Sequence, residues 1–355
     1  MTAPVLIMAG GTGGHIFPGI AVGIELRRRG VPVVWLGGRV GLETRLVPAA
    51  GFELVSLDFS GVRGKGLGTL LGAPLRLLRA VLAARDVLRR VRPRSVLSMG
   101  GYAAAPGGIA AWMARIPLVV HEQNRVPGFT NRLLRRFARV VLEGFSGSIA
   151  GARWVGNPVR SEIAGLPAPQ LRFDSRESGI RILVLGGSQG AQSLNRSLPL
   201  ILGQRPNRAA WQIRHQCGER HLQATRDLYR TANLDADVQP FIADMATAYA
   251  WADLVVCRAG ALTLAELCAA GIGAVLVPFP QAVDDHQTRN AEVLVDAGAA
   301  LLVAEGDGFA QRLGASLDGF ADNRARLLEM ALAARALART DATMLIADVC
   351  MEVPA

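Results

Sequence analysis

The sequence predicts an α/β protein with two doubly wound parallel sheets, one in each of two domains. Short apolar runs alternate with helical patterns along the whole chain, and strands separated by helices pair in parallel through right-handed crossovers. The first apolar run of each half ends in glycines that lead into a helical pattern. With 355 residues, of which 50% are hydrophobic, the chain is long enough to build two cores.

The apolar runs place the strands. In the first half we expect strands at Val5–Ala9, Val31–Leu36, Glu53–Leu57, Ser95–Met99, Pro117–His121 and Arg139–Leu142. In the second half we expect them at Arg181–Leu185, Trp211–His215, Val238–Phe241, Leu254–Cys257, Ala274–Val277 and Ala300–Val303. The residues between these runs would form the crossover helices that cover both faces of a parallel sheet.

The domain boundary is expected near Gly156-Asn157-Pro158. Residues 1–158 would form the first domain and residues 159–332 the second, with a loop around 166–178 just inside the second. Residues 323–349 are rich in alanine, leucine and arginine and are expected to be helical. The helical part from about 333 to 355 is expected to pack back on the first domain, and the two glycine loops would face each other across a cleft.

The charge balance indicates an anionic partner. The formal net charge is +10, and nearly all of the positive charge is arginine, since Lys65 is the only lysine. Such a partner could be nucleic acid, an acidic membrane surface or a phosphorylated substrate. Aromatic residues make up only 5% of the chain and do not line a basic stripe, so nucleic acid is the weakest of the three.

Cysteines and hydropathy bear on location. The four cysteines form no CxxC pair and no short disulfide framework, which favours a reduced, cytoplasmic setting. The amino-terminal MTAPVLIMAGG lacks the basic segment of a signal peptide and is typical of a first strand. The charge-free stretch 95–114 has the length of a membrane span, but its glycines and Pro106 would break a spanning helix. We therefore expect no transmembrane segment.

The two glycine loops, MAGGTGGHIFPG and VLGGSQGAQSLN, indicate phosphate or sugar sites. Each would place a ligand at a helix N-terminus, where free N–H groups and the helix dipole favour negative charge. A nicotinamide-dependent enzyme is disfavoured, because Ile16 occupies the third glycine position of GxGxxG and no acidic residue ends the second strand.

His15, at the end of the first glycine loop, is a candidate general base. It could instead cap the helix or position substrate. The small residues before it, Thr12, Gly13 and Gly14, would let a ligand approach the backbone closely.

The segment CRAGALTLAEL predicts a second anion-binding helix N-terminus at Gly260–Thr263. Glu266 lies one turn further into this helix, where a carboxylate suits the hydroxyls of a ribose better than a diphosphate. Thr263 and Glu266 also have the spacing of a capping box, and both roles could hold together.

Metal binding is only weakly indicated. The segment FPQAVDDHQTRNA gathers Asp284, Asp285 and His286 after a buried strand, but no further ligand follows at a suitable spacing. Asp235 and Asp237 have the shape of a DxD metal motif, but they are expected in a polar surface loop before a strand.

Two further motifs, MGGYAAAPGG and HEQNRVPGFTN, are expected at the cleft side of the first domain. His121, Glu122, Gln123 and Asn124 follow a buried strand, and the carboxyl ends of parallel strands are where such folds bind ligands. Arg160, just after the boundary, could reach a diphosphate.

The stretch GVRGKGLGTLLGAPLRLLRAVLAARDVLRRVRPR combines leucines and valines at three- and four-residue spacing with many arginines. A basic amphipathic helix behind a glycine-rich segment is typical of a surface that docks on anionic lipid. An ordinary crossover helix explains the helical part equally well, so we favour the membrane role for residues 61–71.

Eight motifs together resemble the MurG family of bacterial UDP-N-acetylglucosamine:lipid I glycosyltransferases. In chain order they are GGTGGHIFPG, GVRGKG, GGYAAAPGG, HEQN, VGNPVR, GGSQGAQSLN, RAGALTLAE and DDHQTRNA. One such motif alone would be weak, but eight in order cover nearly the whole chain. Cys257 departs from the pattern, since the resemblance places serine there.

The resemblance implies the GT-B architecture, two Rossmann-like domains facing a cleft, with no cofactor and no catalytic metal. It implies that the donor, UDP-GlcNAc, is held mainly by the second domain. The donor contacts it implies are Thr12, Gly13, Gly14 and Asn124 near the sugar, Arg160 and Ser188 at the diphosphate, Ile242 at the uracil, Ala261, Leu262, Thr263, Leu264, Ala265 and Glu266 at the phosphates and ribose, and Gln287 at the GlcNAc hydroxyls. His15 and Glu266 are the candidate catalytic residues.

The implied reaction is an inverting transfer of GlcNAc to the C4 hydroxyl of the N-acetylmuramyl group of undecaprenyl-linked lipid I. Such an acceptor implies a peripheral protein on the cytoplasmic face of the inner membrane. Two alternatives stay open. One is a transferase of the same fold that acts on another lipid such as diacylglycerol, and the other is a membrane-docked nucleotide sensor without turnover.

Overall fold

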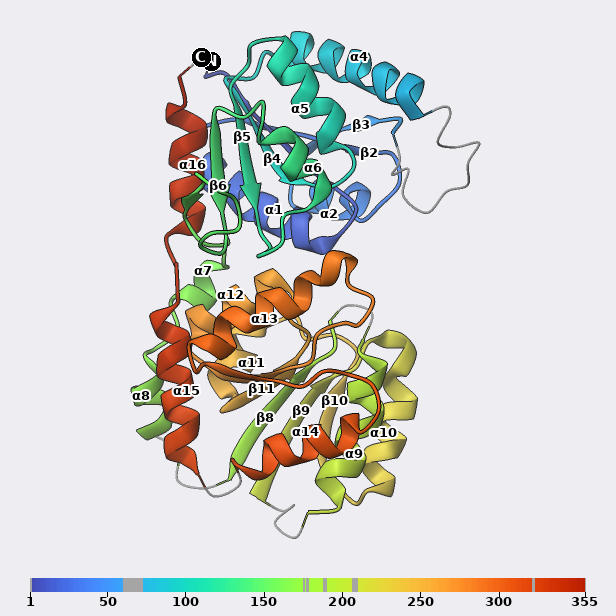
Figure 1. The fold of residues 1–355 in the computed structure, drawn as a ribbon, viewed down its shortest axis with the longest axis vertical. Coiled ribbons are helices and arrows are strands. Elements are labelled where there is room, and N and C mark those ends of the chain that lie inside the picture. The colour runs from blue at the N-terminus through green and yellow to red at the C-terminus, as the bar shows by residue number, and fades with distance from the viewer. Residues whose placement is uncertain are drawn as a thin grey trace. The chain divides into compact units, whose positions relative to one another are not determined.

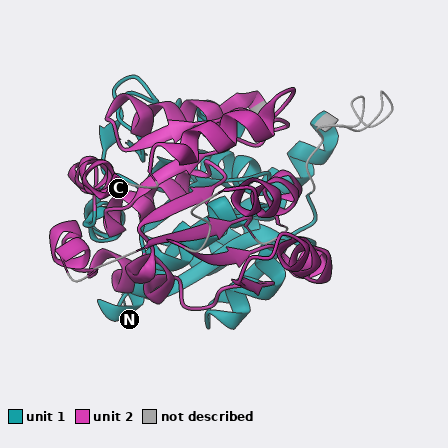
Figure 2. Cartoon of the chain, turned by 90° about the horizontal axis from the view of Figure 1, so that it is seen from below, with its two compact units in different colours: residues 1–159, 340–355 teal, residues 160–339 magenta. Residues whose placement is uncertain are grey.

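The computed structural model describes residues 2–59, 73–174, 176, 179–187, 190–205, 210–320 and 323–354. These residues form two compact units (Figure 2). Unit 1 consists of residues 1–159 and 340–355, and unit 2 of residues 160–339.

Unit 1 is built on a parallel sheet with the strand order β3-β2-β1-β4-β5-β6-β7 (Figure 1). Its strands are β1 (Val5–Ala9), β2 (Val33–Gly38), β3 (Glu53–Leu57), β4 (Ser95–Gly100), β5 (Leu118–Glu122), β6 (Val140–Glu143) and the short β7 (Arg153–Trp154). Its described helices are α1 (Gly13–Arg28), α2 (Glu43–Ala49), α4 (Ala73–Val91), α5 (Ala104–Met113), α6 (Phe129–Leu134) and α16 (Ala342–Glu352).

The sheet of unit 1 is buried on both faces, as expected of a parallel sheet. Alternate residues of β1 enter different cores, because successive side chains of a strand point to opposite faces. Val5 and Ile7 pack with residues of α1 and α16, whereas Leu6 and Met8 pack with residues of α4 and α5.

Unit 2 repeats this plan with the strand order β10-β9-β8-β11-β12-β13. Its strands are β8 (Ile180–Leu185), β9 (Trp211–Gln216), β10 (Ala236–Gln239), β11 (Leu254–Cys257), β12 (Gly273–Leu276) and β13 (Ala300–Leu302). Its helices are α7 (Ser161–Ala164), α8 (Pro169–Asp174), α9 (Gln192–Gly203), α10 (Leu222–Thr231), α11 (Met245–Trp251), α12 (Ala261–Ala270), α13 (His286–Asp296), α14 (Phe309–Asp318) and α15 (Arg324–Ala336), with short 3₁₀ turns η2 (Glu219–His221) and η3 (Val283–Asp285).

The predicted fold class is confirmed. Every strand pairing in both sheets is parallel, and the first strand of each half is followed by a glycine loop and a helix.

Three local predictions are wrong. The strand predicted at Val238–Phe241 runs from Ala236 to Gln239, so Asp237 lies in β10 and outside any loop. The loop predicted at 166–178 contains helix α8. The helical stretch predicted at 323–349 is two helices, α15 and α16, because the alanine- and leucine-rich pattern continues through the residues where the chain leaves unit 2 for unit 1.

Helix α16 belongs to the core of unit 1. Ile346, Ala347 and Cys350 are fully buried in the same cluster as β1 and α1. The Ser95 hydroxyl donates to the Cys350 carbonyl at 2.6 Å, and Arg29 pairs with Asp348. The last helix of the chain is therefore a structural part of unit 1.

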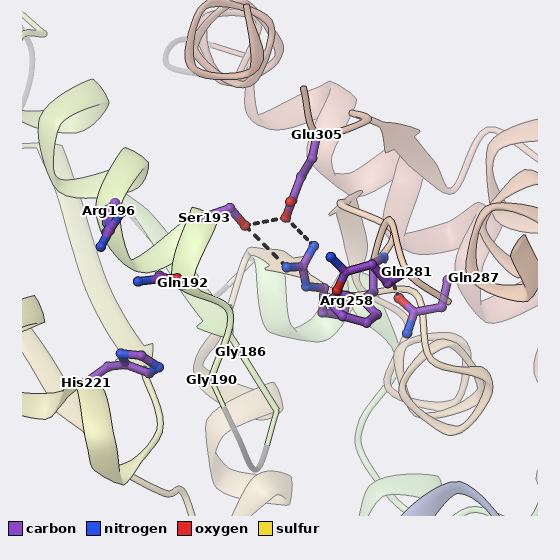
Figure 3. A pocket seen from close by; sticks show the side chains of 11 residues that line it. Gly186, Gly190, Gln192, Ser193, Arg196, His221, Arg258, Gln281, Gln287 and Glu305 are labelled. Atoms are coloured by element: carbon purple, nitrogen blue, oxygen red, sulfur yellow. Dashed lines mark hydrogen bonds and ion pairs between the residues drawn. The ribbon is translucent and has the colours of Figure 1, made fainter. Parts of the chain in front are cut away.

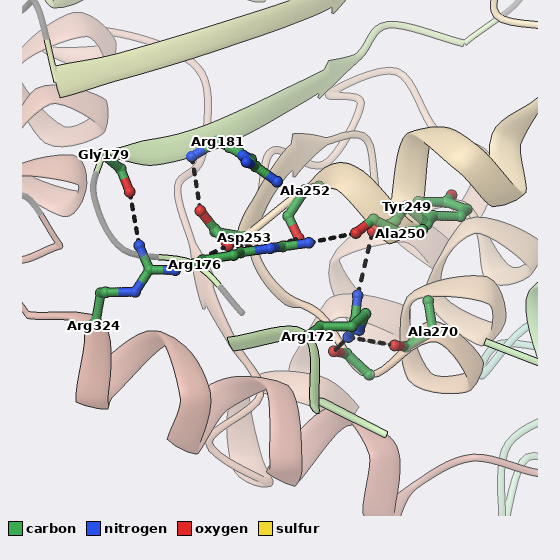
Figure 4. Close-up of polar contacts among 11 residues, drawn as sticks. Arg172, Arg176, Gly179, Arg181, Tyr249, Ala250, Ala252, Asp253, Ala270 and Arg324 are labelled. Carbon is green, nitrogen blue, oxygen red and sulfur yellow. Dashed lines mark hydrogen bonds and ion pairs between the residues drawn. The ribbon is translucent and has the colours of Figure 1, made fainter. Parts of the chain in front are cut away.

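A buried arginine cluster fastens α8 to the rest of unit 2 (Figure 4). Arg172 donates to the carbonyls of Ala270, at 2.7 Å, and of Gly271, and burial lowers the pKa of its guanidinium to about 10. Arg176 forms an ion pair with Asp253, whose side chain is only 1% exposed. A buried carboxylate of this kind needs its partner, since an unpaired charge in the interior is costly.

Of the helices described, none combines the length and the apolarity that a transmembrane helix needs.

Candidate active site

The N-terminus of α12 faces the carboxyl edge of the unit 2 sheet. The helix begins at Ala261, directly after β11 and the N-cap Gly260, as the sequence predicts. Its first N–H groups have no partner within the helix and can bind an anion. The side chains of Ala261 and Leu264 are buried, so their backbone rather than their side chains is offered to a ligand.

The capping box predicted for Thr263 and Glu266 is wrong. Gly260 is the N-cap, and Thr263 already lies inside the helix. The Glu266 carboxylate points elsewhere: Oε1 accepts hydrogen bonds from Arg160 Nη2 at 2.7 Å and Nε at 3.0 Å. Its Oε2 accepts from the Tyr249 hydroxyl at 3.1 Å. Burial, and next the charge of Glu266, raises the pKa of Tyr249, so this hydroxyl remains a donor.

Gln287, in the first turn of α13, links two strand-end segments. Its Oε1 accepts from the Ala259 amide at 3.2 Å and from the Phe279 amide at 2.9 Å. These bonds identify the oxygen of the side-chain amide, so the nitrogen is the atom that can donate to a ligand hydroxyl. Asn290, one turn later, is fully buried and donates to the Ala259 carbonyl.

The remaining residues predicted in the second domain lie at this edge or outside the described residues. Ile242 is 8% exposed and follows β10, next to Asp244, which caps α11 through the Thr247 amide at 2.9 Å. The hydrogen bond with Thr247 lowers the pKa of Asp244. Ser188 lies outside the described residues.

A pocket of about 590 Å³ opens beside the second glycine loop (Figure 3). Its lining is polar and consists of Gly186, Gly190, Gln192, Ser193, Arg196, His221, Arg258, Phe279, Gln281, Gln287 and Glu305. Only Gln287 among these was predicted as a site residue. Arg258 was quoted within CRAGALTLAEL without a role, although an arginine directly after a buried strand was a signal that could have marked it.

In unit 1, His15 lies in the first turn of α1. Its Nδ1 is 3.2 Å from the Thr12 hydroxyl, and Thr12 is the N-cap of the helix. Since Thr12 holds the cap position, His15 does not cap the helix. Gly13 and Gly14 follow Thr12, so the predicted first-domain residues lie on one turn.

Sequence reasoning missed Glu43, which braces the first glycine loop. Its carboxylate is fully buried and accepts from the Gly11 amide at 3.1 Å and the Gly38 amide at 3.2 Å. The Tyr102 hydroxyl lies 2.9 Å from it, and burial, with this contact, raises the pKa of Tyr102 to about 12. Glu43 precedes any recognisable motif, so nothing in the sequence marked it.

The HEQN residues do not all face the solvent, and this part of the prediction is wrong. His121, Glu122 and Gln123 are at most 1% exposed. The His121 Nε2 donates to the Gly156 carbonyl at 2.9 Å, and burial lowers the pKa of His121. Only Asn124 is partly exposed; Glu122 accepts from its amide at 2.9 Å and so fixes the turn that carries it.

No group of three or more metal-ligating side chains occurs among the residues that the structure describes. Asp237 is engaged by Arg214, 3.9 Å away, and by Gln239. Asp284 and Asp285 both adopt left-handed backbone conformations just before α13.

Comparison with known proteins identifies the fold and the family. The model of the glycosyltransferase family 28 N-terminal domain matches residues 5–143, and that of the family 28 C-terminal domain matches residues 181–346. The crystal structure of MurG from Acinetobacter baumannii superimposes with a TM-score of 0.87 and 39% identity, over 98% of this chain and 99% of that one. The calicheamicin glycosyltransferase CalG4, at 16% identity and a TM-score of 0.65, shares the fold.

Curated relatives are more similar still. A protein of Xylella fastidiosa (strain M12) named UDP-N-acetylglucosamine–N-acetylmuramyl-(pentapeptide) pyrophosphoryl-undecaprenol N-acetylglucosamine transferase is 58% identical, over 98% of this chain and 96% of its own length. A protein of the same name from Xanthomonas campestris pv. campestris (strain 8004) is also 58% identical, over 98% of this chain and 82% of its own. With both domain models matched and this identity over nearly the full chain, the protein belongs to glycosyltransferase family 28.

Proposed function

We propose that this chain transfers N-acetylglucosamine from UDP-N-acetylglucosamine to the C4 hydroxyl of the N-acetylmuramyl group of lipid I, which gives lipid II for peptidoglycan synthesis. The observation that carries the proposal is the 58% identity, over 98% of the chain, to transferases named for this reaction. Neither of those relatives is named for diacylglycerol, so the alternative lipid acceptor has no support.

The donor would lie along the N-terminus of α12. The free N–H groups of the first turn and the helix dipole suit the diphosphate, and Glu266 suits the ribose diol. Arg160 already lies against Glu266, so a diphosphate bound between α12 and Arg160 would meet a guanidinium that can form paired hydrogen bonds. Ile242 would contact the uracil, and Ser188 the diphosphate.

The sugar end of the donor would be read by Gln287, and by Thr12, Gly13, Gly14 and Asn124 of unit 1. Gln287 would donate from its nitrogen, since its oxygen is held by two main-chain amides. The glycines of the first loop would permit close approach of a sugar to the backbone.

His15 would act as the general base. If its Nδ1 carries the ring proton and donates to the Thr12 hydroxyl, its Nε2 has the lone pair that can accept a proton. As the acceptor oxygen bonds to the anomeric carbon, its proton passes to His15 and the bond from that carbon to the diphosphate oxygen breaks. UDP leaves with the electron pair, and its growing charge is stabilised by α12 and Arg160.

Unit 1 would dock peripherally on the cytoplasmic face of the inner membrane. Besides its buried stripe, α4 exposes three leucines on the other side: Leu75, Leu78 and Leu82 are 46–54% exposed. Residues 61–71, for which the sequence predicts this role, lie outside the described residues.

The end of α5 continues the same chemistry next to α4. Trp112 is 54% exposed and lies against Phe137, with ring centroids 5.0 Å apart. Around Phe137, Arg135, Arg136 and Arg139 line a pocket of about 390 Å³. Exposed apolar side chains beside arginines suit an anionic lipid surface.

The test uses labelled UDP-N-acetylglucosamine with a lipid I analogue, and diacylglycerol as the competing acceptor. Transfer to the lipid I analogue is the expected result. Transfer to diacylglycerol alone would overturn the acceptor assignment, and donor binding without any turnover would favour the nucleotide sensor.

A further inference from the structure

One guanidinium joins four segments at the carboxyl edge of the unit 2 sheet (Figure 3). Arg258 Nη1 donates to the carbonyls of Val277 and Pro278, each at 3.2 Å, and lies 2.5 Å from Glu305 Oε1. Arg258 Nη2 donates to the Ser193 hydroxyl at 3.3 Å. The segments that follow β11, β12 and β13 and the first turn of α9 are thus held by a single side chain.

Ser193 and Glu305 close this cluster on themselves. The Ser193 hydroxyl donates to Glu305 Oε1, which also receives Arg258. Arg258 and Glu305 are 18% and 20% exposed, so the cluster forms a wall of the pocket and is not part of the interior. The Arg258 guanidinium also lies 5.4 Å from the centre of the Phe279 ring.

Gln287 joins two of the same segments from the other side. Arg258 holds the carbonyls of Val277 and Pro278, whereas Gln287 holds the amides of Ala259 and Phe279. Each residue held by Gln287 is the immediate neighbour of one in the Arg258 network. A shift of Arg258 would therefore move both amides that orient Gln287, and with Ala259 the start of α12.

We propose that Arg258 is a positioning residue for the donor, and that Glu305 and Ser193 hold it in place. It fixes the first turn of α12 and the orientation of Gln287 in one geometry, so that the diphosphate and the sugar are bound in register. This inference rests on the proposed function, because it assigns the donor to α12 and Gln287.

Lysine at position 258 is the informative change. An ammonium keeps the charge and can pair with Glu305, but it cannot reach two carbonyls, a hydroxyl and a carboxylate with the planar geometry of a guanidinium. We expect Arg258→Lys to raise the KM for UDP-N-acetylglucosamine by about 10- to 100-fold, since a misplacement of about 1 Å can cost that much. The KM for the lipid acceptor should stay within about twofold of the parent.

Calorimetry with UDP and with UDP-N-acetylglucosamine separates positioning from a direct contact. Gln287→Ala should weaken binding of the UDP-sugar and leave binding of UDP unchanged. Arg258→Lys should weaken both, because it disturbs α12 as well. Arg226→Lys is the matched control, since Arg226 also bonds a main-chain carbonyl of unit 2, that of Val238, outside the pocket.

If Arg258→Lys does not fold, Glu305→Gln and Ser193→Ala loosen the guanidinium without removing it, and each should raise the donor KM by a smaller factor. A parent enzyme that transfers GlcNAc while Arg258→Lys, or both of these milder variants, keep its donor KM would overturn this inference alone. A parent that neither binds nor transfers UDP-N-acetylglucosamine would overturn the proposed function and this inference with it.

Discussion

Arg160 and Glu266 bind each other in the structure, with Nη2 and Oε1 2.7 Å apart and two guanidinium nitrogens on one carboxylate oxygen. Both are predicted to bind the donor, Arg160 the diphosphate and Glu266 the ribose. Because Arg160 is 48% exposed, the pair can rearrange at modest cost when a ligand enters. The guanidinium also offsets the repulsion between this carboxylate and a nearby diphosphate.

Replacing Glu266 by alanine should weaken UDP binding by about 10- to 150-fold, the loss expected for hydrogen bonds to a charged group worth about 1.5–3 kcal/mol. Calorimetry with UDP and with 2′,3′-dideoxy-UDP measures the effect. The parent should prefer UDP, and the variant should bind the two nucleotides equally. A variant that still discriminates between them would remove Glu266 from the ribose.

Replacing His15 by asparagine should lower kcat by about 10²- to 10⁴-fold, the usual contribution of a general base. The KM for UDP-N-acetylglucosamine should change little. Steady-state kinetics with the lipid I analogue provide the measurement, and Thr12→Val should give a smaller loss, because Thr12 only orients the ring. If the His15 variant turns over like the parent, the proton goes elsewhere.

Membrane binding should depend on the exposed leucines of α4. The triple change of Leu75, Leu78 and Leu82 to serine should reduce binding to phosphatidylglycerol vesicles by more than about 10-fold, because about 25 cal/mol is lost per Å² of apolar surface that no longer inserts. Leu171 and Leu200 of unit 2 are 66% and 50% exposed, and their change to serine is the matched control. Equal losses in both variants would exclude α4 as the docking helix.

Replacing Asp253 by asparagine should destabilise the protein by about 3–5 kcal/mol, because it leaves the buried guanidinium of Arg176 without its counter-charge. Denaturant unfolding followed by circular dichroism measures this. Asp227→Asn, which removes an exposed ion pair with Arg230, should leave the midpoint nearly unchanged. Similar midpoints for the two variants would contradict the structural role given to Asp253.

Stability should fall with pH below neutrality, in part through His215. Burial lowers the pKa of His215 to about 3, well below the value of about 6.5 for the unfolded chain. Between these values the unfolded state binds a proton that the folded state does not, so stability is fully present above pH 6.5 and is lost as the pH falls toward 3. His215→Gln should flatten the dependence of unfolding free energy on pH between 6.5 and 4 relative to the parent, and an unchanged slope would assign the loss to other groups.

The fold could be predicted from the sequence because its signals are local. A run such as Leu254–Cys257, followed by Gly260, predicts a buried strand and a helix start by residue type alone. The break between α15 and α16 could not be seen, because the apolar spacing continues through it and the interruption reflects the passage of the chain from one unit to the other.

The candidate site was only partly predictable. His15 and Glu266 lie beside glycine-rich turns that mark them, but Glu43 and Arg258 act through partners far away in the sequence. Glu43 bonds Tyr102, and Arg258 bonds Ser193 and Glu305, pairings that only the folded chain reveals. His121 and Gln123 were assigned to the surface because strand ends often carry ligand contacts, whereas here they satisfy buried backbone groups.

The place of α16 within unit 1 constrains how the protein matures during synthesis. Ribosomes deliver the amino-terminal part first, yet the sheet that begins at Val5 lacks one of its covering helices until residues 342–352 have emerged. Unit 2, although encoded later, is contiguous and has its full sequence available sooner. The nascent amino-terminal half therefore has to keep an apolar face shielded until translation is complete.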